Sequence, residues 1–270
     1  MSMLLHPAAV MQLQKDSFHG AIESLNQAAG LQHCWDVANG QSYDGSSQTW
    51  IDTVGGYDLY RGPNGTATAA DPTFNGSVDA RDNSAYWSFD GGDYFTPLAG
   101  TGGNTFFNSI HKNNAIFSLA CWIRFNANGS NQYIIGSSSG STIGFGWGMA
   151  SAGSAQRFLI GNGSTQSLSS TSSSGALPTG TWLFLGVAVD EGATTGVHHR
   201  NGVSDNFTST YTSPSASNNA SGLAVAAINA VPQLPLGNAA RLANLTAWNR
   251  ALSSADFDAI FERTRGKFGV

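Results

Sequence analysis

Hydrophobic residues recur at helical spacing in two places, near the beginning of the chain and near its end. Within residues 8–29 the apolar side chains lie three or four positions apart, so we expect a helix with one apolar stripe that ends at Gly30. Residues 254–261 repeat this spacing after Ser253 and Ser254, either of which can accept a hydrogen bond from a free amide of the first helical turn. The sequence therefore predicts an N-terminal helix and a short C-terminal helix.

Between the two helices the hydrophobic period changes to two, which is typical of strands with one buried face. Residues 31–37 show this alternation, and turn-forming residues separate further short stretches at 133–136, 143–149, 157–160 and 166–172. Regular spacing of this kind indicates a β-sandwich or barrel. A chain of 270 residues with 41% hydrophobic content can bury one large core. We expect an N-terminal helical arm over residues 1–30 and one β-sandwich domain over residues 31–270.

Five segments resemble, in the same order, the landmarks of laminin-G-like, concanavalin-A-like jelly-roll domains. They are SFDGGDYF at 88–95, IFSLACWIRF at 116–125, LPTGTWLFLGVAVD at 177–190, HHRNGV at 198–203 and WNRALS at 248–253. The first and fourth segments contain glycine turns that suit β-hairpins. The resemblance implies an all-β fold, an antiparallel two-sheet jelly-roll sandwich with an N-terminal α-helix and a short C-terminal α-helix.

Charge and composition exclude several classes of partner. Charged residues make up 11% of the chain, the net charge is −5, and Lys and Arg form no cluster, so we expect neither nucleic acid nor an anionic membrane as a partner. No apolar run approaches the ~18 residues of a membrane span, and the first residues lack the charged and apolar regions of a signal peptide. The sequence therefore predicts neither a membrane helix nor export by a cleaved signal.

The two cysteines, Cys34 and Cys121, are too few for a disulfide framework. Cys121 alternates in step with the apolar residues Phe117, Leu119 and Ile123 of its predicted strand. We therefore expect a free thiol in the core, because unpaired cysteine is among the most buried residue types. A bridge between the two cysteines is the alternative.

Some relatives of this fold are glycoside hydrolases, which hold two carboxylates on either side of the scissile bond. The chain has three glutamates, Glu23, Glu191 and Glu262, and no two of them lie two or four positions apart on a strand. The G-x-S-x-G pattern at 136–140 is followed by strand-like residues and not by the helix that a nucleophile elbow needs. We therefore expect no catalytic residues and no enzymatic activity.

Candidate metal ligands are histidines and loop carboxylates. His198 and His199 are adjacent, and adjacent strand residues point to opposite faces, so we expect a solvated hairpin and not a shared metal site. Relatives of this fold often hold Ca²⁺ through loop oxygens. Four such carboxylates are present at Asp79, Asp82, Asp90 and Asp93. They do not match a family calcium site residue by residue, so we expect no metal and no cofactor, with Ca²⁺ as the alternative.

Sugar binding by this fold, as the resemblance implies, uses an exposed aromatic platform near the rim of the sandwich. Most of the 15 Phe, 7 Trp and 7 Tyr must fill the core. Trp147, Tyr133 and Tyr211 lie at predicted loop or strand-end positions. We therefore predict these three as ligand-binding residues.

The sequence leaves three functions open. The first is a non-enzymatic structural or adhesive protein of a bacteriophage virion surface (capsid decoration, head-fibre or tail-associated), made in the host cytoplasm and with weak host-glycan binding. The second is a soluble bacterial carbohydrate-binding lectin, and the third is a glycan-active hydrolase on the same fold.

The apolar stripe of the N-terminal helix has two interpretations. It packs on the chain's own sandwich, or it docks to other virion proteins or to a second copy of the chain. The candidate docking residues are Met11, Phe18, Ile22 and Leu25.

Overall fold

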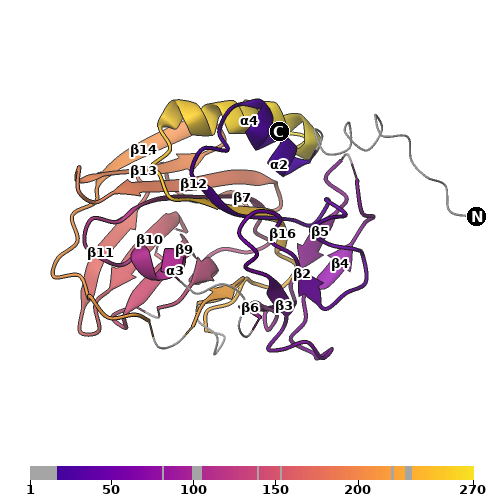
Figure 1. Cartoon of the computed structure of the whole chain (residues 1–270), viewed down its shortest axis with the longest axis horizontal. Coiled ribbons are helices and arrows are strands. Elements are labelled where there is room, and N and C mark those ends of the chain that lie inside the picture. The colour runs from indigo at the N-terminus through magenta and orange to yellow at the C-terminus, as the bar shows by residue number, and fades with distance from the viewer. Residues whose placement is uncertain are drawn as a thin grey trace, which may run out of the picture.

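The computed structural model describes residues 17–80, 82–98, 105–138, 140–152, 154–219, 222–228 and 233–270. Two antiparallel sheets, called sheet A and sheet B, pack face to face to form a sandwich (Figure 1). The predicted all-β, two-sheet fold is confirmed. Met11 and the predicted beginning of the N-terminal helix lie outside the described residues.

Sheet A brings the final strand of the chain into its middle. Its strands follow the order β14 (Val203–Thr208), β13 (Thr195–Arg200), β12 (Leu183–Asp190), β7 (Ile116–Arg124), β16 (Arg241–Trp248), β5 (Tyr86–Ser88) and β4 (Thr73–Asn75). A further strand, β1 (Leu31–Asp36), pairs with β16. The first and last strands are therefore neighbours, so the sheet is complete only when both ends of the domain have folded.

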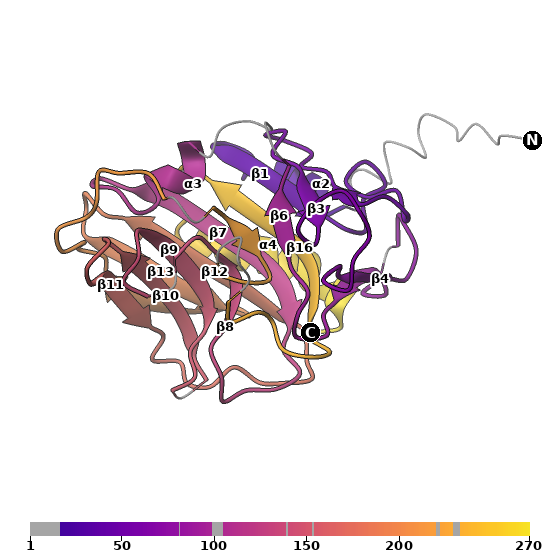
Figure 2. The same ribbon diagram turned by 90° about the horizontal axis from the view of Figure 1, so that it is seen from below.

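Sheet B lies beneath sheet A and contains the predicted short strands of the middle of the chain (Figure 2). Its order is β11 (Gln166–Thr171), β10 (Gln156–Gly161), β9 (Gly144–Met149), β8 (Gln132–Gly136), β15 (Ala224–Val225), β6 (Phe95–Pro97), β3 (Leu59–Arg61) and β2 (Thr49–Trp50). Strands β8 to β11 are consecutive neighbours, each paired with the next. They form one continuous outer face.

The main core fills the space between the sheets. Alternate residues of each strand point into it, as the period of two predicts. On β9 the sequence GFGWGM sends Phe145, Trp147 and Met149 into the core and leaves glycine at the intervening positions. On β7, Phe117 and Leu119 meet them from sheet A.

A second apolar layer covers the outer face of sheet A. The helix α4 (Ser254–Phe268) crosses that face, and its Phe268 ring stacks on Trp122 with the ring centroids 4.1 Å apart. Phe257 packs on Gly186 of β12, where an added Cβ would lie 2.6 Å from the Phe257 Cε1 atom. Only a residue without a side chain allows the helix to approach this closely.

The C-terminal helix begins as predicted. The Ser253 hydroxyl accepts the amide of Asp256, and the Asp256 carboxylate accepts the amide of Ser253, which forms a capping box. The helix continues for 15 residues. The predicted C-terminal helix is confirmed, and it continues beyond residue 261 because the apolar contact with sheet A extends to Phe268.

The N-terminal helix in the described part of the chain is α2 (Phe18–Ser24), and it starts later than the predicted stripe. Ser17 has an extended backbone, with φ −72° and ψ 161°, and its hydroxyl caps the helix by accepting the amide of Gly20. A helix running through Ser17 to residue 29 is therefore wrong. The remaining element, α3 (Thr105–Ser109), is a single short turn of helix.

Three of the predicted docking residues pack on the chain's own sandwich. Phe18 and Ile22 are buried in the second apolar layer, and Leu25 packs against its edge. The prediction that they dock a partner is corrected, because the outer face of sheet A already covers them. Met11 lies outside the described residues.

Cys34 and Cys121 are free and buried. Cys34 belongs to the layer beneath the helices, whereas Cys121 belongs to the core between the sheets. The predicted free thiol is confirmed, and burial raises the pKa of both thiols. Among the described residues no helix is long and apolar enough to cross a membrane.

Candidate functional site

The three predicted ligand-binding aromatics do not form an exposed platform. Trp147 is 0% exposed in the core between the sheets, and Tyr211 is 5% exposed with its hydroxyl donating to the carbonyl of Ile110 at 3.0 Å. Tyr133 lies on the outer face of sheet B but is 2% exposed. The prediction is wrong for these rings, because strand alternation and covering segments bury them.

The outer face of sheet B has a covered apolar half and an exposed polar half across β8 to β11. Its apolar half is a small cluster of Tyr133, Leu159 and Ile228. Gly146 lies beneath that cluster, where an added Cβ would lie 2.7 Å from the Tyr133 Cε1 atom. The glycines of β9 therefore allow an aromatic ring to lie flat against the sheet.

The polar half of this surface is built around Arg157 of β10. Its Nη2 donates to Gln166 Oε1 at 3.3 Å and to Ser169 Oγ at 3.2 Å, both across the hairpin on β11. Gln166 and Ser169 are exposed, and Arg157 is half-buried. We call Tyr133, Arg157, Gln166 and Ser169 the outer patch.

Strand register places Arg157 and Tyr133 in one row across the sheet. Arg157 pairs with Gly148, and Gly148 pairs with Tyr133. Two strand spacings of about 4.8 Å set their backbones roughly 10 Å apart, with no side chain between them. Burial raises the pKa of the Tyr133 hydroxyl, and the Arg157 charge opposes that rise.

The outer patch therefore offers a cation and neutral hydrogen-bonding groups on one exposed surface, beside the buried ring of Tyr133. Arg157 was not among the residues predicted from the sequence. A lone arginine between two core residues of a strand is a signal that its side chain points outward, but it does not reveal the neighbours.

The predicted loop carboxylates have different surroundings. The Asp79 carboxylate accepts the amide of Gly40, and Asp82 is exposed. Asp93 is buried and accepts the amide of Asp90, and burial, followed by the nearby Asp90 carboxylate, raises the pKa of Asp93 to about 7. The described residues contain no group of three or more His, Cys, Asp or Glu that could hold a metal ion.

His198 and His199 are both buried, so the expected solvated hairpin is wrong. They do point to opposite faces of β13. His198 lies 2.9 Å from Ser170 Oγ of sheet B, and His199 stacks on Phe257 of α4. Burial lowers the pKa of each imidazole to about 4.

A second buried histidine contact lies at the rim, beside the loop after β2. His33 Nδ1 lies 2.7 Å from Asp52 Oδ2, and the Asp52 carboxylate also accepts the backbone amides of Cys34 and Tyr57. Burial alone would raise the pKa of Asp52, but these hydrogen bonds hold it below its ordinary value. With both oxygens occupied by backbone amides, Asp52 fixes the conformation of the loop.

The three glutamates lie on separate elements. Glu191 accepts the amide of Asn114 in the turn after β12, Glu262 pairs with Arg265 on α4, and Glu23 belongs to α2. None of them lies on the outer patch.

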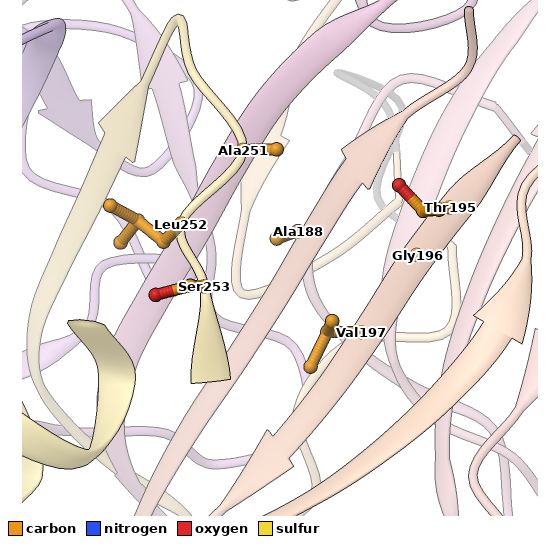
Figure 3. A pocket seen from close by; sticks show the side chains of 7 residues that line it. All are labelled: Ala188, Thr195, Gly196, Val197, Ala251, Leu252 and Ser253. Carbon is orange, nitrogen blue, oxygen red and sulfur yellow. The ribbon is translucent and has the colours of Figure 1, made fainter. Parts of the chain in front are cut away.

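A shallow cavity lies on the opposite side of the molecule, between β12, β13 and the segment that leads into α4 (Figure 3). Its lining consists of Ala188, Thr195, Gly196, Val197, Ala251, Leu252 and Ser253. Its volume of about 210 Å³ is below the ~300 Å³ at which small-molecule pockets begin. Small apolar side chains dominate it, so it offers few groups that could orient a polar ligand.

Comparison with solved structures supports the fold. Domain 4 of a GH43 extracellular arabinanase from Geobacillus stearothermophilus, solved with arabinotriose, has a TM-score of 0.56 at 12% identity, covering 86% of this chain and 98% of that chain. The Trypanosoma rangeli sialidase in complex with the inhibitor DANA has a TM-score of 0.55 at 14% identity. The match covers 94% of this chain but only 37% of the sialidase.

A third similar structure is the binding domain of botulinum neurotoxin DC in complex with rat synaptotagmin II. Its TM-score is 0.54 at 14% identity, and the match covers 86% of this chain and 51% of that chain. No curated protein matches in sequence. A family model described as the concanavalin A-like lectin/glucanases superfamily matches residues 98–257, which is more than half of the chain. This chain therefore belongs to the concanavalin A-like lectin/glucanases superfamily.

Proposed function

We propose that this chain is a non-enzymatic glycan-binding domain and that the outer patch of sheet B is its binding surface. The observation that carries the proposal is the exposed group of hydrogen-bonding side chains around Arg157, next to the ring of Tyr133. Glycans present many hydroxyl groups, which donors and acceptors of this kind can contact together.

The structural neighbours are consistent with this proposal. The arabinanase domain was solved with arabinotriose. Botulinum neurotoxin type C, whose structure has a TM-score of 0.53 at 16% identity, depends for cell entry on interaction with two ganglioside molecules. Both ligands contain sugars. The neighbours also include enzymes, so the choice between binding and catalysis must come from the residues of this chain.

The composition of the outer patch supports binding over hydrolysis. Glycoside hydrolysis commonly needs two carboxyl groups about 5–9.5 Å apart, one as acid and one as nucleophile or base. The residues Tyr133, Arg157, Gln166 and Ser169 include no carboxylate. A sugar bound there would meet hydrogen-bond donors but no carboxyl group that could protonate the glycosidic oxygen.

The interpretation as a bacteriophage virion surface component stays a prediction from the sequence. A glycan-binding domain on a particle and a soluble lectin would use the same surface. They differ in whether the domain is attached to a virus particle or acts as a free protein.

The proposal is tested by glycan-array binding of the purified chain and of two double variants. Gln166→Ala with Ser169→Ala removes the exposed polar groups of the outer patch, whereas Asn206→Ala with Thr208→Ala removes matched groups from the exposed edge strand β14 of sheet A. We expect the first variant to lose affinity about tenfold, from two neutral hydrogen bonds of about 0.5–1.5 kcal/mol each, and the second to bind as the original chain does.

The same glycans are then incubated with the protein and assayed for new reducing ends. Equal binding by the original chain and the outer-patch variant would reject the binding surface. Release of reducing ends that is lost in a single Asp variant would reject the non-enzymatic assignment.

A further inference from the structure

We propose that the outer patch selects glycans that carry a carboxylate, and that Arg157 is the residue that binds this group. The inference rests on the proposed glycan-binding function and adds the chemical class of the ligand.

The first observation is that the charge of Arg157 has no counterion. No described carboxylate lies within ion-pair distance of its guanidinium, and Nη2 donates only to the neutral Gln166 and Ser169. Its Nε is buried and has no hydrogen-bond partner in the described structure. A buried donor without a partner loses its bonds to water and gains nothing in return.

The second observation is that other arginines of the chain have strong partners. Arg200 donates to the carbonyl oxygens of Ala176 and Ser174 at 2.9 and 2.7 Å. Arg250 lies 3.4 Å from the carboxylate of Asp256. These arginines hold loops and helix ends together, whereas Arg157 lies in the middle of an outer face and joins only two exposed side chains.

The third observation concerns the surroundings of Arg157. Its neighbours in the strand row, Gly148 and Thr171, are uncharged. Gly148 has no side chain, and an added Cβ there would clash with the Gln132 carbonyl oxygen, so no side chain of β9 lies between Arg157 and Tyr133. A ligand carboxylate at Arg157 would meet no negative side chain of the outer patch.

A guanidinium and a carboxylate match in geometry as well as in charge. The planar guanidinium can give two parallel hydrogen bonds to one carboxylate, and hydrogen bonds between charged groups are about twice as strong as neutral ones. The net charge of the chain is −5, so general attraction cannot draw acidic glycans to the protein. Selectivity for them must come from a local contact, and Arg157 supplies one.

The experiment measures binding by titration calorimetry with two matched pairs of probes. Sialyllactose and trigalacturonic acid are each compared with their methyl esters, so that the members of each pair differ only in the charge of the carboxyl groups. The variants are Arg157→Gln, which removes the charge, and Arg157→Lys, which keeps the charge but lacks the planar guanidinium with its paired donors. Arg263→Gln is the control, because it removes the same charge from an exposed position on α4 over the other sheet.

We expect the acidic member of at least one pair to bind about tenfold or more tightly than its neutral partner, and this preference to weaken as salt rises. Arg157→Gln should abolish the preference, Arg157→Lys should keep part of it, and Arg263→Gln should leave it unchanged.

Three outcomes overturn the inference. Equal binding of both members of each pair rejects carboxylate selection while leaving glycan binding in place. A preference that survives Arg157→Gln places the carboxylate at another residue. Absence of binding by all four probes and by the glycan array rejects the proposed function together with the inference. Thermal unfolding of each variant shows that any loss occurs in a folded chain.

Discussion

Acid should destabilise this protein through the two buried histidines of β13. His198 contacts Ser170 and Phe207 inside the sandwich, and the carboxylate of Asp205 on β14 lies near it. His199 lies under α4, where its Nδ1 is 3.1 Å from Ser204 Oγ and 3.9 Å from the Asp258 carboxylate. Burial outweighs both carboxylates and lowers the pKa of each imidazole to about 4.

The direction of this pH effect follows from the protons that the folded and the unfolded chain bind. In the unfolded chain a histidine binds its proton below about pH 6.5, whereas each folded imidazole binds it only below about pH 4. Between these values the unfolded chain holds more protons, so the free energy of unfolding falls as the pH falls. At 1.36 kcal/mol per pKa unit, each histidine removes on the order of 2 kcal/mol by pH 5 and 3 kcal/mol by pH 4.

The assay measures the free energy of unfolding by urea at several pH values from 8 to 5. It compares the original chain with the variants His198→Gln and His199→Gln. Each variant should be less stable at pH 8, because glutamine packs less well than the imidazole. Its stability should nevertheless fall by about 2 kcal/mol less than that of the original chain between pH 8 and pH 5. Variants that lose stability as steeply as the original chain would refute the reasoning.

Two further predictions use the same measurement. Phe257→Ala should lower the free energy of unfolding by about 3–5 kcal/mol, because it opens a cavity where α4 packs on Gly186; a loss below about 1 kcal/mol would mean that α4 is not needed for the fold. Asp93→Asn should stabilise the protein more at pH 8 than at pH 5. The folded pKa of Asp93 is about 7, so the buried carboxylate of the original chain lowers the free energy of unfolding increasingly as the pH rises. An equal effect of the substitution at both pH values would contradict this direction.

Local patterns predicted the strands and the C-terminal helix, because these depend on residues close in sequence. The alternation in GFGWGM and the cap at Ser253 lead directly to β9 and α4. The same alternation placed His198 and His199 on opposite faces. It could not show that both are buried, because their covers come from β11 and α4, far away in the chain.

The candidate site was harder to predict, since it depends on what covers each face. Trp147 was predicted to bind a ligand although the period of two puts it in the core. Tyr133 does face outward, but Ile228 covers it from a segment more than 90 residues later. The isolation of Arg157 becomes visible only when its neighbours across the hairpin are known.

The position of α2 and α4 over sheet A has a practical consequence for attaching this protein to a support. Gln27, just after α2, donates to the carboxylate of Asp256 in the first turn of α4 at 2.7 Å, and both helices lie over the outer face of sheet A (Figure 1). A tether joined after Val270 would therefore leave from the side of the molecule opposite strands β8 to β11. An immobilised sample would present those strands to the surrounding solution, and sugars could reach them without passing the linker.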